Sequence, residues 1–493
     1  MILDQYRNPV SSTNKLIHGA SQNRFRGPQF NISNKGIDEL ITERDREVIC
    51  GLSQRLYCNM GALKSVINQK AQYSVGNAWL PNYTGPDKAE GLQVSDWLKT
   101  YFFPSLDVRA GVWDWWQNLK SVSKEIDIRG DHFTLLTTTP DRKHARIKTI
   151  PAHSIHNKDA KYSKGAQRVK SGKYRGNKIK YGIIYDKNEK AIAYRVSTGE
   201  KQTDYKDIPA RSIIHSFDPF VSDGSRGLPV ASHSLEDLKH VLQSTEYERS
   251  RQLILSSIGL FVENDTGGPD LDNPLLNVDR DYYGDEVTTE EISPQIWYAK
   301  GGNGNKITQL KHETGGDSFE SFHDRMIRSF VAGADWSYSL TWKPTGQGTA
   351  ERGEILRARE AVKARQKILE RWALRVVSFA YAIEVKNGNL PTLEDLTKFE
   401  FTKPPRLSVD DGREAKMLMD GYRLGKDNMT DILQLEGRTY EQHLNLRIDE
   451  AILRKQKIQE AAAAGYNIDE RELVMFTPNE VSATNNNQQL TDE

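Results

Sequence analysis

The sequence predicts a multidomain α+β fold that is mostly α-helical. Apolar residues recur at helical spacing in residues 36–75, 235–257 and 350–383, and each of these stripes predicts an amphipathic helix. β-branched, alternating residues mark much of the stretch from Ile126 to Val196, which indicates strands. At 493 residues, the chain has room for roughly two to four domains.

Composition excludes several classes of protein. The net charge is +1, so the whole chain is not a basic DNA-coating protein. The two cysteines, Cys50 and Cys58, suit neither a disulfide framework nor a metal site, which indicates assembly in a reducing cytoplasm. No apolar run approaches the ~20 residues that cross a bilayer, and the N-terminus lacks the apolar segment of a signal peptide. We therefore expect no membrane partner.

The N-terminal part begins with a polar segment, residues 1–35, which we expect to be an extended arm. A helical stripe follows from Gly36 to about Val75, where Gly76 stops it. A second helical region spans residues 93–120 and carries a tryptophan cluster made of Trp113, Trp115 and Trp116. Such a cluster can stack on bases, but aromatic side chains are more often buried, so we expect a core position.

The strand region contains a hairpin with a polar turn at residues 186–190. Ahead of it, residues 157–180 hold nine Lys or Arg against one acid, Asp159. This run can be a phosphate-facing patch or a solvated loop. The solvated loop is the favoured interpretation, because such runs usually lie on mobile surface.

A small acidic module separates two further helices, predicted at residues 235–257 and 317–332. Residues 263–291 contain ten acids and a single base, Arg280. The segments SPQIWYAK and KITQL, which follow it, predict short strands around a GGNGN turn.

A Gly-, Thr- and Ser-rich segment, GADWSYSLTWKPTGQGTAERG, precedes the long helix predicted at 350–383. Residues 351–375 of that helix hold eight Lys or Arg and four Glu, so the helix is locally basic. After the prolines of KPPRLS we expect short helices up to Gly437, a helix at Tyr440–Ala464, and a polar, disordered tail.

Catalytic motifs are absent from the sequence. It has no Walker A, GxSxG, HExxH or dinucleotide-binding glycine pattern. His153 and His156 form an HxxH without a nearby Cys or His partner, which favours ordinary hydrogen-bonded histidines over a metal site. We therefore expect no catalytic residue, no metal and no cofactor.

Four segments, in order along the chain, resemble the lambda-type portal protein family of tailed bacteriophages, the head–tail connectors. They are SVGNAWLP, IKYGIIYDKNEKAIAYRV, IPARSIIHSFDPFVSDGSRGLPV and PPRLSVDDGREAKMLMDGYRLGKDNMTDILQLEGRTYEQ. In the two middle segments the matching residues are Gly182, Ile183, Asp186, Ala193, Tyr194, Ile208, Pro209, Ala210, Ile214, His215, Arg226, Gly227 and Pro229. The resemblance covers roughly residues 37–460; the arm matches weakly, and residues 263–291 do not align.

The resemblance implies a portal-like subunit of a dodecameric ring at one capsid vertex. It assigns an N-terminal arm (1–35), an α+β wing (36–230), stem helix 1 (231–257), a clip (258–316), stem helix 2 (317–336), a tunnel loop (337–350), the long wing helix and its return (351–407), a helical crown (408–465) and a polar tail (466–493). The expected location is the virion, after assembly in the cytoplasm of a bacterial host.

The same resemblance implies two candidate sites. The DNA-facing residues of the tunnel loop are Thr341, Trp342, Lys343, Thr345, Gln347 and Thr349. The partner-docking residues of the clip are Asp279, Asp281, Asp285, Glu286 and Trp297. The implied partners are other copies of the chain, double-stranded DNA passing non-specifically, the terminase large subunit, the head–tail adaptor, and the major capsid protein or scaffold.

Two other functions remain open at this point. A metal-dependent nucleic-acid enzyme of phage or mobile-element origin would need a carboxylate cluster, and no clear cluster stands out in the sequence. A minor capsid or scaffolding protein is disfavoured, because nine Trp, 20 Tyr and a central strand region are unusual for a scaffold.

Overall fold

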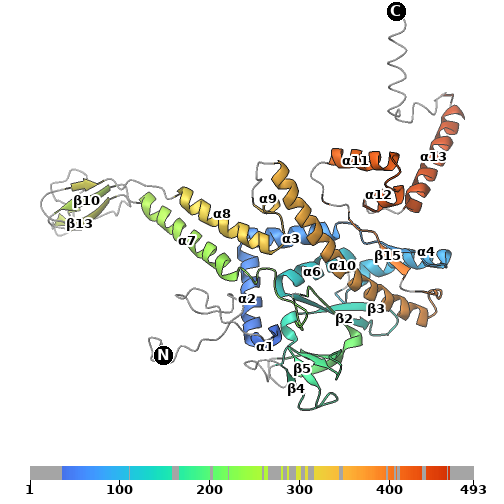
Figure 1. Cartoon of the computed structure of the whole chain (residues 1–493), viewed down its shortest axis with the longest axis horizontal. Coiled ribbons are helices and arrows are strands. Elements are labelled where there is room, and N and C mark those ends of the chain that lie inside the picture. Colours follow the sequence, from blue (N-terminus) through green and yellow to red (C-terminus); the bar gives the residue numbers. More distant parts are fainter. Residues whose placement is uncertain are drawn as a thin grey trace, which may run out of the picture.

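The computed structural model describes residues 36–109, 112–157, 166–199, 204–219, 221–257, 316–342, 348–395, 398–404, 407, 411–435, 440–463 and 465–466, together with short strands between 260 and 308. The expected arm and nearly all of the expected tail therefore lie outside the described residues. A helical hairpin of α7 and α8 extends away from a mixed α and β body, with β10 and β13 at its far end (Figure 1). The last helices lie on the opposite side of the body (Figure 1).

The stripe at residues 36–75 forms three helices rather than one, which corrects the prediction of a continuous helix. They are α1 (Ile37–Leu40), α2 (Glu43–Asn59) and α3 (Gly61–Val75). A capping box of Thr42 and Asp45 starts α2, and an extended Met60 (φ −119°, ψ 114°) separates α2 from α3. These local signals override an apolar spacing that runs across the breaks.

The second helical region also differs from the prediction. It consists of α4 (Lys88–Trp97), a π-helical turn (Leu98–Phe102), α5 (Phe103–Ser105) and α6 (Trp115–Arg129). A capping box of Asp114 and Gln117 starts α6, which continues past residue 120 and past the expected start of the strands at Ile126. It ends at Gly130, whose φ of 84° is left-handed, as is common at helix C-termini.

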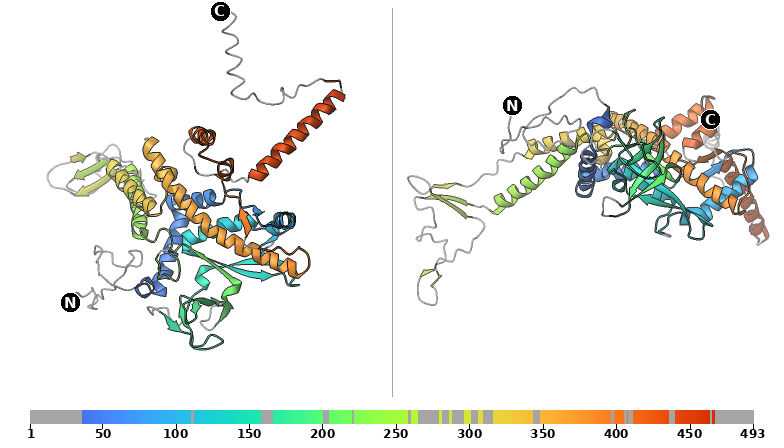
Figure 2. Two further views of the ribbon diagram at one scale, coloured as in Figure 1. Left: turned by 45° about the vertical axis from the view of Figure 1, so that its right-hand side comes forward. Right: turned by 90° about the horizontal axis from the view of Figure 1, so that it is seen from below.

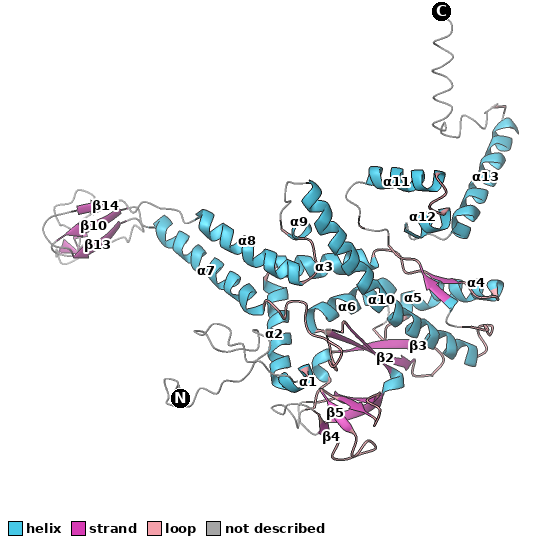
Figure 3. Ribbon diagram, viewed as in Figure 1, coloured by secondary structure: helices cyan, strands magenta, loops and turns pink. Residues whose placement is uncertain are grey.

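The two larger sheets of the body have three and five strands (Figure 3). The first has the order β3-β2-β9 and contains β2 (Asp131–Thr138), β3 (Ala145–Ile150) and β9 (Ile213–Phe217). The second has the order β4-β5-β6-β7-β8 and contains β4 (Gln167–Arg168), β5 (Lys178–Lys180), β6 (Ile183–Tyr185), β7 (Ala191–Ser197) and β8 (Tyr205–Pro209). The hairpin of β6 and β7, with its turn at 186–190, is confirmed; Asp186 accepts the backbone N–H groups of Asn188 and Lys190.

The projecting hairpin contains α7 (Leu235–Ser257) and α8 (Gly316–Gly333), close to the predicted bounds. Between them, β10 (Leu260–Asn264) lies at the centre of a sheet with β13 (Ile296–Lys300) and β14 (Lys306–Thr308), and β11 (Asp279–Arg280) pairs with β12 (Glu286–Val287). The right-hand view of Figure 2 shows the same separation of these strands from the body. The described strands of the acidic segment are therefore carried on the hairpin, away from the core.

The long helix α10 (Gly348–Lys386) packs across the body and is preceded by a short helix, α9 (Tyr338–Thr341). Four residues of the segment predicted as the tunnel loop (337–350) form α9. Trp372 of α10 is buried against Trp115, with ring centroids 5.4 Å apart. Trp115 also stacks on Phe103 at 4.1 Å, so the core interpretation of the tryptophan cluster is confirmed for Trp115.

The chain returns from α10 through a two-stranded sheet of β1 (Pro81–Tyr83) and β15 (Phe399–Phe401). Three helices follow: α11 (Asp411–Arg423), α12 (Met429–Leu435) and α13 (Tyr440–Ala463), as the sequence predicts. Among the described residues, no helix is both long and apolar enough to cross a bilayer.

Candidate functional site

One carboxylate links the two sides of the segment 343–347, which joins α9 to α10. Glu354 in α10 accepts the backbone N–H of Ser339 at 2.9 Å and the hydroxyl of Ser337 at 3.2 Å. Ser337 in turn caps α9, because its hydroxyl accepts the N–H of Leu340 at 3.3 Å. The start of α9 is therefore fixed to the second turn of α10.

A second bond network ties α9 to α3. The Gln69 amide donates to the backbone carbonyl of Leu340 at 2.8 Å and accepts the indole N–H of Trp336 at 3.1 Å. The ring of Tyr73 lies 6.2 Å from that of Trp336. Together with Glu354, these contacts hold the ends of the segment 343–347 against the body of the protein.

The structure places part of the predicted tunnel-loop set at this position. Thr341 ends α9, and its hydroxyl donates to the Ser337 carbonyl at 2.7 Å. Trp342 follows it and leaves 50% of its surface exposed. Thr349 lies in the first turn of α10. The remaining members lie outside the described residues: Lys343, Thr345 and Gln347.

Three of the five predicted clip residues lie on described strands at the tip of the hairpin. Asp279 in β11 lies opposite Val287, and Glu286 in β12 lies opposite Arg280. Trp297 in β13 lies beside Phe261 of β10 in parallel register. The antiparallel pairing brings two of the four predicted acids onto adjacent strands. Asp281 and Asp285 lie outside the described residues.

Asp131, at the start of β2, is a buried carboxylate with four hydrogen-bond partners. One of its oxygens accepts Arg226 Nε at 2.8 Å and also bonds Arg46. The other accepts the backbone N–H of Gly227 at 2.9 Å and lies 3.0 Å from His215 Nε2. We call this set the Asp131 hub; it joins α2, β2, β9 and the segment before α7.

The buried charged groups of the Asp131 hub are neutralised by one another rather than by solvent. Burial by itself would raise the pKa of Asp131, but the charges of Arg226 and Arg46 and the hydrogen bond to His215 hold it well below its usual range. Burial lowers the pKa of His215 despite its contact with Asp131. A neutral His215 that donates to an ionised Asp131 fits both shifts.

Two glycines allow the chain to approach itself at the Asp131 hub. A Cβ on Gly227 would lie 2.1 Å from the Gly130 carbonyl oxygen, and a Cβ on Gly130 would lie 2.4 Å from the Gly227 carbonyl oxygen. Side chains are therefore excluded at both positions. The Arg-Gly pair of the portal-like segment thus has a structural explanation: Arg226 reaches Asp131 while Gly227 passes against Gly130.

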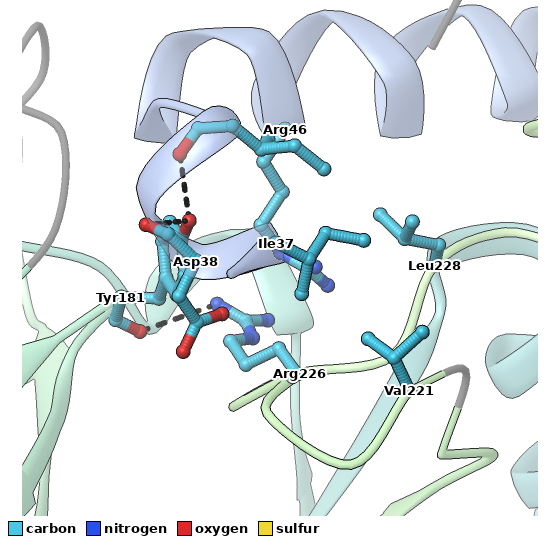
Figure 4. A pocket seen from close by; sticks show the side chains of 9 residues that line it. Ile37, Asp38, Arg46, Tyr181, Val221, Arg226 and Leu228 are labelled. Carbon is cyan, nitrogen blue, oxygen red and sulfur yellow. Dashed lines mark hydrogen bonds between the residues drawn. The ribbon is translucent and has the colours of Figure 1, made fainter. Parts of the chain in front are cut away.

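A cavity of about 20 Å³ lies beside the Asp131 hub, below α1 (Figure 4). Its walls include Ile37 and Leu228, and Asp38 and Tyr181 lie at one side. The Tyr181 hydroxyl lies 2.7 Å from the carbonyl oxygen of Ile41 and 3.1 Å from that of Asp38. The polar groups that line this cavity thus fix α1 to the second sheet.

A larger groove of about 340 Å³ lies between α2 and residues 152–156. Glu43, at its edge, accepts the backbone N–H of Asn157 at 2.7 Å. Burial raises the pKa of Glu43 to about 7, although the bond from Asn157 and the charge of Arg226 oppose the shift. Within the described part of the chain, no group of three or more His, Cys, Asp or Glu side chains is arranged to hold a metal ion.

A second buried cluster joins α3, α6 and α10. Asp127 accepts Arg365 Nη2 at 2.5 Å, and Lys70 Nζ lies 3.8 Å from the same oxygen. Arg365 also donates to the Ser123 carbonyl at 2.9 Å. This cluster fixes the orientation of α10 about its own axis, which determines the residues that α10 presents to solvent.

The basic run at 157–180 is partly ordered into the second sheet. Lys178 pairs with Glu189 at 2.6 Å and Lys180 with Asp38 at 3.1 Å, while residues 158–165 lie outside the described part. Of the six cations of this run that the structure describes, two therefore make these ion pairs within the subunit.

Comparison with known proteins identifies the chain at the family level. No curated protein matches the sequence. Solved structures with a similar fold include the chains described as "Neck of empty GTA particle computed with C6 symmetry" and "Neck of native GTA particle computed with C12 symmetry". Each is 10% identical with a TM-score of 0.44 and covers 78% of this chain; the coverage of the other chain is 94% and 92%. A chain of "Virion of native gene transfer agent (GTA) particle" is 10% identical, with a TM-score of 0.43 and coverage of 80% and 94%. The family model "Phage portal protein, lambda family" matches residues 24–366, and the chain therefore belongs to the lambda family of phage portal proteins.

Proposed function

We propose that this chain is one of twelve subunits in a ring that conducts double-stranded DNA into and out of a capsid, and that the ring docks the terminase and then the head–tail adaptor. The family supplies the general part of this function: its members are structural, non-enzymatic virion components that form the channel at the capsid vertex. The number of subunits, the individual partners and the residues that meet them are our proposal.

The observation that carries the proposal is the hairpin of α7 and α8, which holds a small β module away from the body (Figure 1). We assign the helices to the stem (231–257 and 317–336) and the module to the clip (258–316). The body is then the wing (36–230, with 351–407), and α11, α12 and α13 form the crown (408–465). A module held at the end of two helices is accessible to a partner that approaches the ring from one side.

We assign residues 337–350 to the channel lining. The described contacts support this, because Glu354 and Gln69 fix both ends of a short segment that contains Lys343. A ring repeats Lys343 once per subunit, and a belt of single positive charges attracts phosphates without reading sequence. DNA is then held loosely enough to slide.

We assign partner docking to the acids of the clip. The tip is strongly acidic, with ten acids in residues 263–291, and like charge deters adhesion of DNA to the outer mouth. A basic face of the terminase large subunit or of the head–tail adaptor would complement it. The wing would contact the major capsid protein or a scaffold.

Photo-crosslinking in DNA-filled particles tests the channel assignment. A photoreactive amino acid in place of Trp342 should crosslink to packaged DNA, whereas the same group in place of Glu90, an exposed residue of α4, should not. Equal yields at both positions, or no crosslink at Trp342, would rule out residues 337–350 as the channel lining.

A further inference from the structure

The exposed side of α10 carries an uninterrupted row of positive charges. Between residues 363 and 375, the exposed residues of this helix are Lys363, Ala364, Lys367, Arg371 and Arg375. All four long side chains are cationic. We call these four cations the α10 ridge.

The packing of α10 keeps the ridge turned outward. On its other side, Arg365 is bonded to Asp127 and Ser123, and Trp372 donates to the Thr134 hydroxyl at 2.8 Å. Val376 is fully buried in the same core. Rotation of the helix would break these contacts, so the row is a fixed feature of the surface. The left-hand view of Figure 2 shows α10 running along the near side of the body.

The spacing of the α10 ridge is regular. Its members are four residues apart, which places them about 6 Å apart along the axis and spreads the row over about 18 Å. Arg375 also donates to the carbonyl of Arg211 at 3.2 Å, and the side chain of Arg211 is itself exposed. The row therefore continues from α10 onto the turn before β9.

The chemistry of the ridge suits a polyphosphate better than a protein. The core of a protein interface carries aromatic and aliphatic anchors, and this strip has none. In contrast, α13 exposes Leu446, Ile448 and Leu453. Two acids of α10 lie beside the row: Glu360 pairs with Lys363 at 2.7 Å, and the partly buried Glu370 pairs with Lys403 at 3.3 Å. Lys367, Arg371 and Arg375 extend the positive charge beyond the first pair.

We propose that the α10 ridge is a second, sequence-independent contact surface for the backbone of double-stranded DNA, separate from residues 337–350. The contact would be electrostatic, made to phosphates and weakened by salt. The proposal shares with the proposed function the premise that this portal handles double-stranded DNA, but it does not depend on Lys343 or on the lining of the channel.

The test measures binding of the purified full-length protein to a labelled duplex of random sequence by fluorescence anisotropy across a salt series. The ridge variant carries Lys363→Gln, Lys367→Gln and Arg371→Gln, and leaves Arg375 and its bond intact. The matched control removes three exposed cations of α13, with Arg447→Gln, Lys455→Gln and Lys457→Gln. A charge-preserving variant carries Lys363→Arg, Lys367→Arg and Arg371→Lys.

We expect the ridge variant to bind at least tenfold more weakly at low salt. Its slope of log K against log salt should fall by about 0.9 for each cation that meets a phosphate. The α13 control and the charge-preserving variant should bind like the wild type. An equal loss in the α13 control would overturn the proposal, because net charge alone would then explain binding. Unchanged affinity and slope in the ridge variant would also overturn it. A ridge variant that still binds DNA but no longer associates with other subunits would overturn it as well, because the ridge would then contact an acidic protein surface.

The wild type and a Lys343→Gln variant separate this result from the proposed function. A wild type that binds no duplex overturns the shared premise. If the wild type binds duplex DNA and the ridge variant binds it equally well, only the proposal about the α10 ridge is overturned. Lys343→Gln should weaken duplex binding only through the channel lining, so the loss caused by the three ridge substitutions should persist when they are added to Lys343→Gln.

Discussion

Arg226 donates its Nε–H to the buried carboxylate of Asp131 at 2.8 Å, across 95 positions of sequence. The contact connects the segment that leads into α7 to β2. Because Arg46 of α2 bonds the same oxygen, one carboxylate positions the base of the projecting hairpin against both the first helices and the sheet.

Loss of the carboxylate charge should be costly. Asp131→Asn leaves two buried guanidinium groups facing a neutral amide, and breaking a buried pair in this way costs about 3–5 kcal/mol. Urea unfolding of the variant against the wild type measures the loss. Asp141→Asn, at an exposed turn, is the control. A loss below about 1 kcal/mol for Asp131→Asn would contradict the account of the hub.

The pH dependence of stability should carry the signature of Glu43. Its pKa is raised to about 7 in the folded chain, above the ordinary value of about 4.3, so the folded state holds this proton more tightly. The free energy of unfolding should therefore fall as pH rises from about 4.3 to 7. Glu43→Gln keeps an acceptor for Asn157 and should flatten this decline, with a gain on the order of 2 kcal/mol at pH 8.

Urea midpoints at pH 5 and pH 8 check the prediction for Glu43. Glu90→Gln, at an exposed position, should follow the wild type at both values. A Glu43→Gln variant with the same difference between pH 5 and pH 8 as the wild type would contradict it.

The Glu354 link should govern local opening at α9. Glu354→Ala removes the acceptor for the Ser339 N–H and the Ser337 hydroxyl, which should weaken this turn by about 1–3 kcal/mol. Hydrogen exchange in peptides that cover residues 337–342 should be at least fivefold faster. Glu360→Ala, at an exposed site further along α10, provides the comparison. Equal protection in the two variants would mean that Glu354 does not hold the segment.

The acidic tip should determine partner docking. A variant carrying Asp279→Asn, Asp281→Asn, Asp285→Asn and Glu286→Gln should bind purified terminase large subunit or head–tail adaptor at least tenfold more weakly in biolayer interferometry, because a complementary basic face loses its counter-charges. The control neutralises four exposed acids elsewhere: Glu90, Asp96, Glu400 and Glu450. Unchanged binding by the clip variant would show that the clip acids are not part of the docking surface.

Local signals made much of this fold predictable. The helix at 235–257 has the predicted bounds, and the hairpin turn at 186–190 lies where its polar residues place it. The single helix predicted at 36–75 was wrong, because the apolar spacing continues through the capping box at Thr42 and the extended Met60. The apolar spacing alone does not reveal a break between two helices when the residues on both sides of the break face the same core.

The Asp131 hub was not predictable in the same way. Its partners Arg46 and Arg226 lie 85 and 95 positions away, and no local pattern links them. Arg226, Gly227 and His215 stood out only as members of a portal-like segment, without a reason for their identity. The structure supplies that reason, since all three bond Asp131 and Gly227 also passes against Gly130.

Electron microscopy of the purified full-length protein, combined with mass determination and with coexpression of the capsid proteins, tests the central claim most directly. We expect rings with a central hole and about twelvefold symmetry, with the α7 and α8 hairpins projecting from one face. A homogeneous monomer or dimer that forms no ring even with the capsid proteins, and that cleaves DNA when Mg²⁺ is added, would contradict it.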